Sequence, residues 1–255
     1  MRTGLVGGAL ADRLLNRLGD PDANGYCDGS AYHGRSKLEV LFGPQIWQEV
    51  QGRDVVDFGC GEGRDAVEML QRGARHVVGV DILERSLDRA RRAAREAGVA
   101  DRCEFSDRPT APVDVVISVD GFEHFDDPGG VLRLMAGTLK PEGRVLLTFG
   151  PTWLHPLGGH LFSVFPWAHL VFTEPALIRW RARFRKDGAT RFREVEGGLN
   201  QMTIRRFERL VAESPLEFET FEAVPIRRLR SVASFLPREL CTSFVRSRLR
   251  RRHRA

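Results

Sequence analysis

Long apolar runs are absent from this chain of 255 residues. The nearest candidate, residues 161–172, is too short to cross a bilayer and contains Pro166. Charged side chains, among them Asp12 and Arg13, interrupt the first 18 residues, so these lack the apolar core of a secretory signal peptide. The sequence therefore predicts no transmembrane segment and leaves only peripheral membrane contact open.

Cysteine is scarce as well, with four residues in the whole chain. They lie at positions 27, 60, 103 and 241, and no two have C-x-x-C spacing. Cys60 sits in a glycine-rich turn that a disulfide would distort. These features predict a reducing compartment, the cytoplasm.

Composition allows one large folded unit. A hydrophobic content of 42% over this length supports an α/β domain with a subdomain, and two independent domains are not expected. The formal net charge of +5 is uneven, because arginines gather in residues 179–193 and again in 246–254. Nucleic acid, anionic lipid or an acidic substrate could use such surfaces, and a solvated surface is the simpler interpretation.

The most informative segment is Val55–Gly63, in which an apolar strand runs into three alternating glycines and then opens a helix. Glycine lets the backbone turn sharply and lets a ligand approach the peptide groups and the helix N-terminus. A dinucleotide site would need a small residue where Arg64 stands, which disfavours a nicotinamide oxidoreductase.

With Asp57 before the first glycine, the pattern D-x-G-x-G-x-G resembles the first motif of class I S-adenosylmethionine-dependent methyltransferases. The likeness continues in order along the chain. It is carried by residues 77–81, 103–107, 113–120 and 139–148, and it spans about residues 53–150.

The resemblance implies S-adenosylmethionine as cofactor and a place for each end of it. The methionine end is expected at Asp57, Gly59, Cys60, Gly61 and Gly63, the ribose at Asp81 and Ile82, the adenine side at Ser106 and Asp107, and further pocket contacts at Asp120 and Gly121. Upstream, Arg35 or Lys37 could approach the methionine carboxylate, although a solvated turn explains them equally well.

Strands alternate with helical segments, which predicts a parallel sheet with right-handed crossovers. Helices are expected near residues 65–72, 84–97, 128–138 and 203–213, and late strands near 216–224 and 240–249. The predicted fold is α/β: a Rossmann-like, seven-stranded, mostly parallel sheet with helices on both faces and a lid inserted after strand five.

The predicted division of the chain has five parts. They are an N-terminal helical layer (1–52), the cofactor-binding core (53–150), a lid or acceptor insertion (151–200), completion of the sheet (201–249) and a basic tail (250–255).

Acceptor chemistry is expected directly after strand four. Glu123 and His124 resemble the E-H pair of small-molecule methyltransferases of the ubiquinone-biosynthesis type, so His124 is predicted as a base with Glu123 beside it. His124 could instead merely shape the cofactor pocket. In the lid, His160 is the predicted acceptor contact, within an aromatic segment that suits a lipid-like molecule or, alternatively, forms a satellite core or a dimer face.

A divalent metal is a weaker alternative. Asp120, Glu123 and His124, with one of His155, His160 or His169, resemble the metal cluster of relatives that carry E-x-x-E-H, and such donors suit Mg or Mn. Because Asp stands where those relatives have Glu, no residue is assigned as a metal ligand.

The sequence thus predicts an S-adenosylmethionine-dependent methyltransferase that acts on an oxygen of a small or lipid-like metabolite. An RNA methyltransferase is one alternative, disfavoured because neither an N-P-P-Y-like motif nor an RNA-binding module is recognisable. A non-catalytic S-adenosylmethionine-binding protein is another. The oligomeric state is not predicted.

Overall fold

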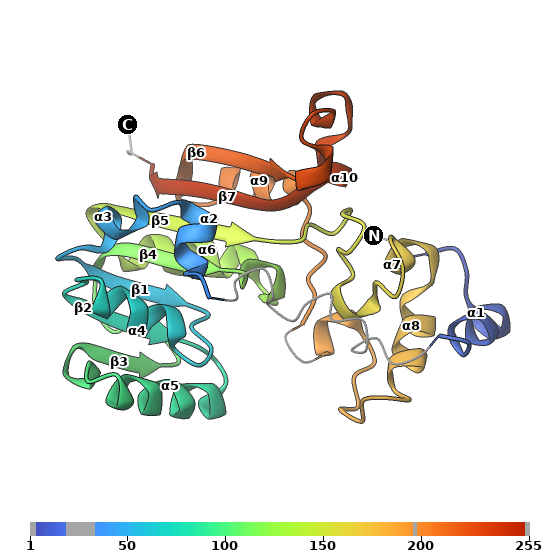
Figure 1. The fold of residues 1–255 in the computed structure, drawn as a ribbon, viewed down its shortest axis with the longest axis horizontal. Coiled ribbons are helices and arrows are strands. Elements are labelled where there is room, and N and C mark those ends of the chain that lie inside the picture. The colour runs from blue at the N-terminus through green and yellow to red at the C-terminus, as the bar shows by residue number, and fades with distance from the viewer. Residues whose placement is uncertain (1–3, 19–33, 196–197, 253–255) are drawn as a thin grey trace.

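Seven strands form a single sheet in the computed structural model, which describes residues 4–18, 34–195 and 198–252 (Figure 1). The strand order is β3-β2-β1-β4-β5-β7-β6. The strands are β1 (Asp54–Phe58), β2 (His76–Val80), β3 (Cys103–Ser106), β4 (Val113–Val119), β5 (Leu139–Phe149), β6 (Leu216–Pro225) and β7 (Thr242–Arg251). β1 to β5 pair in parallel, and β7 runs antiparallel to both β5 and β6. The predicted seven-stranded, mostly parallel sheet is confirmed.

Helices connect these strands. The α-helices are α1 (Gly8–Leu15), α2 (Lys37–Phe42), α3 (Ile46–Val50), α4 (Arg64–Gln71), α5 (Glu84–Glu96), α6 (Pro128–Thr138), α7 (Ala168–Val171), α8 (Glu174–Arg181), α9 (Ile204–Ala212) and α10 (Arg238–Cys241). Short 3-10 helices are η3 (Ala100–Arg102), η4 (Phe122–His124), η5 (His160–Phe162), η6 (Phe192–Glu194), η7 (Arg227–Leu229) and η8 (Ala233–Phe235). None of the helices in the described parts of the chain has the length and apolarity needed to cross a bilayer.

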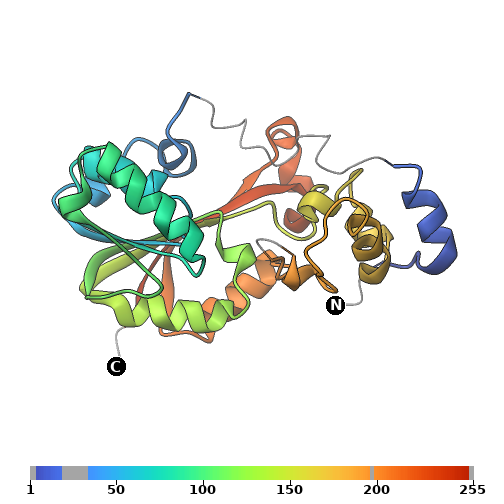
Figure 2. The same ribbon diagram turned by 90° about the horizontal axis from the view of Figure 1, so that it is seen from below.

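Both faces of the sheet are covered, as predicted (Figure 2). One hydrophobic cluster joins the sheet to α2, α3, α4 and α5, and a second joins it to α6 and α9. Burial on two sides explains why β1 and β4 read as continuous apolar runs instead of alternating patterns. The side chains of Asp127 and Thr203 accept hydrogen bonds from the first turns of α6 and α9, which fixes where those helices begin.

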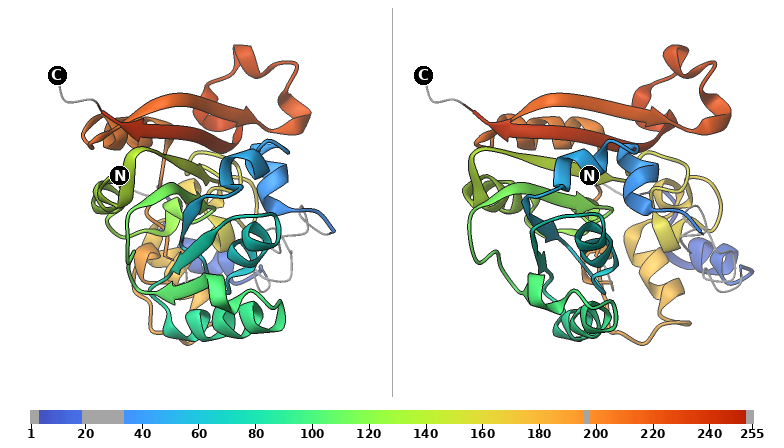
Figure 3. Two further views of the ribbon diagram at one scale, coloured as in Figure 1. Left: turned by 90° about the vertical axis from the view of Figure 1, so that its left-hand side faces the viewer. Right: turned by 60° about the vertical axis from the view of Figure 1, so that its left-hand side comes forward.

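Residues 151–195 and α1 together build a helical subdomain beside the carboxyl ends of the parallel strands (Figures 1 and 3). Its core buries Trp153, Phe162 and Phe172, so these aromatics form the satellite core that the sequence left as an alternative. Phe165 and Trp167 keep 37% and 39% of their surface exposed.

The N-terminal segment differs from the prediction of one layer over residues 1–52. α2 and α3 cover the sheet, whereas α1 packs on the subdomain through buried Ala11 and Leu15. Asp12 forms an ion pair with Arg179 of α8 at 2.9 Å. Ala11 and Leu15 of α1 pack into the aromatic core of the subdomain. Residues 1–52 are therefore divided between the subdomain, which holds α1, and the sheet, which holds α2 and α3.

The C-terminal strand is also shifted relative to the sequence prediction. β7 starts at Thr242 because the preceding residues form α10, and it runs on to Arg251, two residues past the predicted end of this strand. Arg250 pairs with Glu217 of β6 at 2.9 Å, so part of the predicted basic tail belongs to the sheet. Residues 253–255 lie outside the described residues.

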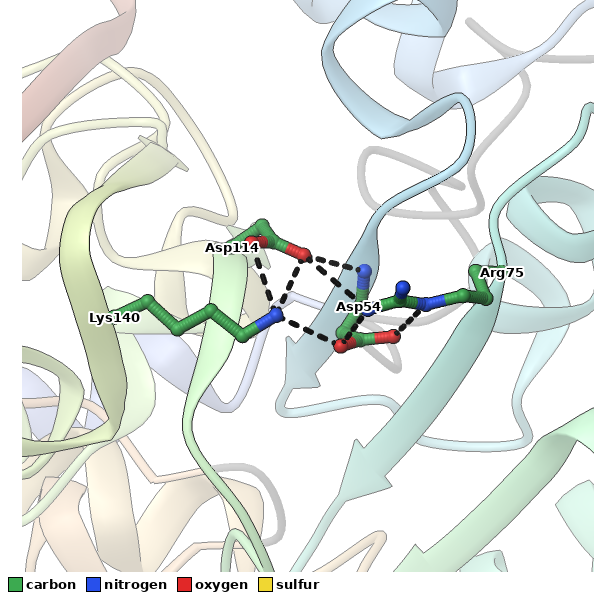
Figure 4. A network of polar contacts seen from close by, with 4 residues as sticks. All are labelled: Asp54, Arg75, Asp114 and Lys140. Atoms are coloured by element: carbon green, nitrogen blue, oxygen red, sulfur yellow. Dashed lines mark hydrogen bonds and ion pairs between the residues drawn. The ribbon is translucent and has the colours of Figure 1, made fainter.

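A polar network at the amino edge of the sheet joins β1, β4 and β5 to the residue before β2 (Figure 4). Lys140 Nζ donates to Asp54 at 2.8 Å and to both oxygens of Asp114 at 3.0 Å. Asp114 also accepts the Asp54 backbone N–H at 2.9 Å. The Arg75 guanidinium, followed by Lys140, holds the pKa of Asp54 down to about 2.

We predict that Lys140→Met lowers the free energy of unfolding by about 1 kcal/mol at pH 7, since the network is partly solvent-screened. A carboxyl group with a depressed pKa stabilises the fold above its unfolded pKa of about 4, and that contribution disappears as the pH falls towards 2. Urea denaturation should therefore show the difference from wild type shrinking between pH 5 and about pH 2. Lys186→Met, at an exposed position, is the control, and an equal loss there would refute the assignment.

Candidate functional site

The glycine turn after β1 has the backbone that its sequence predicts. Gly59, Gly61 and Gly63 have φ angles of 82°, 52° and 76°, in the left-handed region that favours glycine. A Cβ on Gly63 would lie 2.7 Å from the Cβ of Ala90 in α5, so this glycine permits close helix packing. A Cβ on Gly61 would meet no heavy atom within 4 Å, so the turn leaves open space at its tip.

Asp57 lies beneath this turn with only 2% of its surface exposed. Its Oδ2 has no hydrogen-bond partner among the described residues. Burial raises the pKa of Asp57 well above its usual range, Asp65 and Asp81 raise it further, and Lys37 opposes them. A buried carboxyl group in such surroundings would be satisfied by a cationic ligand.

Asp81 follows β2 and reaches back to the turn. It accepts hydrogen bonds from the backbone N–H groups of Gly61 at 3.0 Å and Leu83 at 2.9 Å. A carboxylate has about four acceptor positions, so Asp81 can still accept from a ligand. Ile82 beside it is 89% exposed, on the rim of this open space.

The residues predicted for the adenine side also lie at the rim. Ser106 ends β3, and its Oγ donates to Arg108 O at 2.6 Å. Asp107 is exposed and pairs with Arg108 at 3.3 Å. Cys60, in contrast, is buried in the core next to the sheet, and burial raises the pKa of its thiol. The Cys60 thiol thus packs in the core, and only the Cys60 backbone lies in the turn.

Asp120 and Gly121 follow β4. Asp120 has a φ of 47°, an uncommon conformation for this residue type, and its carboxylate pairs with Lys37 at 3.1 Å. Burial opposes the charge of Lys37, but Asp120 and Asp65 raise its pKa above the usual value. Lys37 thus lies near two acids, Asp120 and Asp65. Arg35, the other cation predicted upstream, is exposed.

Glu123 is buried, with 3% of its surface exposed. One carboxyl oxygen accepts the Gly150 N–H at 3.0 Å, and the other has no partner among the described residues. Burial, followed by the charge of Asp120, raises the pKa of Glu123 to about 8. Burial therefore favours the protonated form of Glu123.

His124 is oriented by the segment that returns from the subdomain. Its Nδ1 lies 2.8 Å from Gly198 O. Because a carbonyl oxygen only accepts, Nδ1 carries the proton, and Nε2 is the proton-accepting nitrogen. Asn200 holds the same turn: its side-chain amide donates to Phe122 O at 2.8 Å and to Phe125 O at 2.9 Å.

His160 is the subdomain histidine that meets this turn. Its ring centroid lies 5.2 Å from that of His124, and its φ is 48°. Burial and the neighbouring His124 lower the pKa of His160 to about 3, so its imidazole is neutral. His169 is held by Trp153 O at 2.7 Å, and His155 accepts the Leu157 N–H at 2.9 Å. Both of these histidines serve local structure.

One donor atom each from Glu123, His124 and His160 lie within 4.8 Å of one another. A carboxylate with two imidazoles can ligate a divalent cation, and the Glu123 oxygen without a described partner would be satisfied by one. Asp120 is turned to Lys37 and is not in this group. The donor set thus fits a metal, although it differs from the one that the sequence suggested.

Two groups at this site escaped the sequence analysis. Asp65 opens α4 beside Asp57, and burial raises its pKa; an acid in the first helical turn after the glycines was the available signal. Asn200 had no local signal, because its partners lie 75 and 78 residues earlier in the chain.

Fold and site together define a class: Rossmann-like α/β proteins whose glycine turn and acid-tipped strands hold a nucleoside-containing cofactor. A family model described as a methyltransferase domain matches residues 9–253, and the chain belongs to this family.

Individual relatives agree with this family. A ubiquinone biosynthesis O-methyltransferase of Idiomarina loihiensis is 37% identical over 141 residues, covering 53% of this chain and 56% of the relative. A 27-O-demethylrifamycin SV methyltransferase of Amycolatopsis mediterranei is 35% identical over 103 residues, or 38% of each chain. The chain thus spans about half the length, or less, of the curated relatives it matches.

A solved structure shares the fold. The crystal structure of an S-adenosylmethionine-dependent methyltransferase from Mesorhizobium loti superposes with a TM-score of 0.52 at 19% identity. The match covers 80% of this chain and 93% of that one.

We predict that alanine at Gly61 and alanine at Gly63 lower the free energy of unfolding by different amounts. Gly63→Ala should lower the free energy of unfolding by about 2–3 kcal/mol, because its Cβ collides with Ala90 in addition to adopting an unfavourable φ. Gly61→Ala should cost about 1 kcal/mol, the conformational part alone. Gly98→Ala, with a φ of 69° and open space, is the matched control in urea denaturation. Equal losses at all three positions would contradict the packing role of Gly63.

Proposed function

We propose that the protein transfers the methyl group of S-adenosylmethionine to an oxygen atom of a small or lipid-like metabolite. The observation that carries this proposal is the buried Asp57 carboxyl group, which lies beneath a glycine turn near further acids and has one oxygen without a partner among the described residues. S-adenosylmethionine carries an ammonium and a sulfonium group, and a cluster of acids at the carboxyl edge of the sheet suits both.

The remaining contacts follow the geometry of the turn. The open space at Gly61 admits the methionine part of the cofactor next to backbone N–H groups. The Asp81 carboxylate accepts the ribose hydroxyls, and Ser106 and Asp107 lie towards the adenine. Asp120 and Gly121 border the pocket from β4.

Methyl transfer is an in-line displacement in which the sulfonium charge disappears. The acceptor oxygen forms a bond to the methyl carbon, the carbon–sulfur bond breaks, and the hydroxyl proton passes to a base. His124 Nε2 accepts this proton, because Gly198 O fixes the proton of the ring on Nδ1. His160, neutral and adjacent, lines the acceptor side from the subdomain.

The proposal assigns no step to a metal. If a divalent cation binds, Glu123, His124 and His160 would hold it, and it would polarise the acceptor hydroxyl. Repeating the turnover assay with a metal chelator distinguishes methyl transfer without a metal from transfer that needs the cation.

The relatives support an oxygen acceptor, since one is named a ubiquinone biosynthesis O-methyltransferase and another a 27-O-demethylrifamycin SV methyltransferase. The basic segments that raised the RNA alternative are partly consumed by internal pairs: Arg179 binds Asp12, and Arg181 binds Asp187. We propose the cytoplasm as location, on the cysteine pattern alone.

Cofactor binding is the first test. We predict that calorimetric titration with S-adenosylhomocysteine shows saturable binding to wild type and a ten- to hundred-fold weaker Kd for Asp81→Ala, the loss expected for hydrogen bonds to a charged group. Asp101→Ala, an exposed acid in η3, should leave the Kd unchanged. Failure of the folded wild type to bind would refute the proposed cofactor.

Turnover tests the base. We predict that His124→Gln lowers kcat by 10²–10⁴-fold on whichever phenolic or polyprenyl-phenolic acceptor is turned over, while the Kd for S-adenosylhomocysteine stays unchanged. Asn200→Ala should lower kcat by a smaller factor, because it only frees the turn that carries His124. His76→Gln, at the opposite edge of the sheet, is the control. Undiminished turnover in His124→Gln would exclude this histidine as the base.

A further inference from the structure

The connection between β6 and β7 projects from the body of the protein. Residues 226–241 form η7, η8 and α10 in place of a tight hairpin turn. Figure 1 shows this segment rising above α10, and Figure 3 shows it standing clear of the sheet from two further directions. We call residues 226–240 the β6–β7 projection.

Apolar side chains are exposed on this projection. Phe235 is 87% exposed, Val232 44%, Leu236 40% and Leu240 38%. Scattered exposed apolar residues are ordinary, but four within nine positions, with a nearly bare phenylalanine in a 3-10 turn, form a patch. An exposed apolar patch of this kind is typical of a surface that binds a partner or a membrane.

The charge around the patch has one sign. Arg227, Arg228 and Arg230 are exposed, and within the described residues none of them has an ion pair. No acidic residue occurs between positions 226 and 238. Glu239 is already engaged, because its carboxylate accepts the Ile204 and Arg205 N–H groups at the start of α9, at 3.1 and 2.9 Å.

The projection is rooted at the functional edge of the sheet. β7 pairs antiparallel with β5, and Val245 lies opposite Phe149, the last residue of β5. Thr152, at the start of the subdomain, donates to Glu239 O at 3.4 Å. A surface that receives the projection therefore faces the same edge as the glycine turn and His124.

We propose that the β6–β7 projection docks on the surface of an anionic phospholipid bilayer. Phe235 and its apolar neighbours enter the boundary between headgroups and acyl chains, and the three arginines contact the lipid phosphates. A bilayer matches this surface better than a protein groove does, because the projection is convex and Arg227, Arg228 and Arg230 have no ion pair among the described residues. This inference does not depend on which acceptor the enzyme methylates.

Co-flotation of the full-length protein with vesicles tests the proposal directly. Wild type is expected to bind vesicles of phosphatidylcholine with phosphatidylglycerol, to bind vesicles of phosphatidylcholine alone far less, and to be released as salt rises. Each arginine contributes roughly five-fold to partitioning, so Arg227→Gln with Arg228→Gln should reduce it roughly 25-fold. Phe235→Ala should reduce it roughly ten-fold.

Matched variants keep the test specific. Arg92→Gln with Arg95→Gln removes the same charge from exposed positions of α5, at the opposite end of the sheet, and Leu134→Ala trims an exposed apolar residue of α6. Both should bind vesicles as wild type does, and all variants should keep the wild-type unfolding transition and affinity for S-adenosylhomocysteine. No vesicle binding by wild type, or equal losses in the matched variants, would overturn the proposal. A wild-type dimer in analytical ultracentrifugation that Phe235→Ala dissociates would assign the patch to a second copy of the chain instead.

Discussion

The parallel pairing of β1 with both β2 and β4 is the constraint on which the rest of the structure depends. The chain winds outward from β1 in one direction to β2 and β3, and in the other to β4 and β5. Connections on the two sides therefore diverge at the carboxyl ends of β1 and β4, the place where α/β sheets bind ligands. The glycine turn, Asp81 and the Asp120–His124 turn all meet there because each follows a strand of this group.

The same constraint concentrates acidic groups where water is excluded. Asp57 and Glu123 are buried with one oxygen each unpartnered in the described chain, and the pKa of both is raised. Lys37 supplies a positive charge in this region and is already paired with Asp120. Buried acids with an unpartnered oxygen lower the stability of a fold, whereas the satisfied network around Lys140 stabilises the opposite edge.

The segment that returns from the helical subdomain holds the turn after β4 through hydrogen bonds. Gly198 and Asn200 attach to the turn after β4, and Trp153 N–H donates to Met202 O at 2.7 Å where the subdomain begins. The entering and returning segments are thus tied together, with a separate aromatic core behind them.

The sequence by itself determined the sheet strands, the glycine turn and the order of the acids that follow the strands, because each is marked by a local pattern of residues: apolar runs, alternating glycines and an acid at the end of a run. Local signals also gave α5, α6 and α9 to within one or two residues. Tertiary structure alone decided that α1 joins the subdomain and that Asn200 fixes the turn after β4. Those outcomes depend on packing between segments far apart in the chain, which no local pattern of residues records.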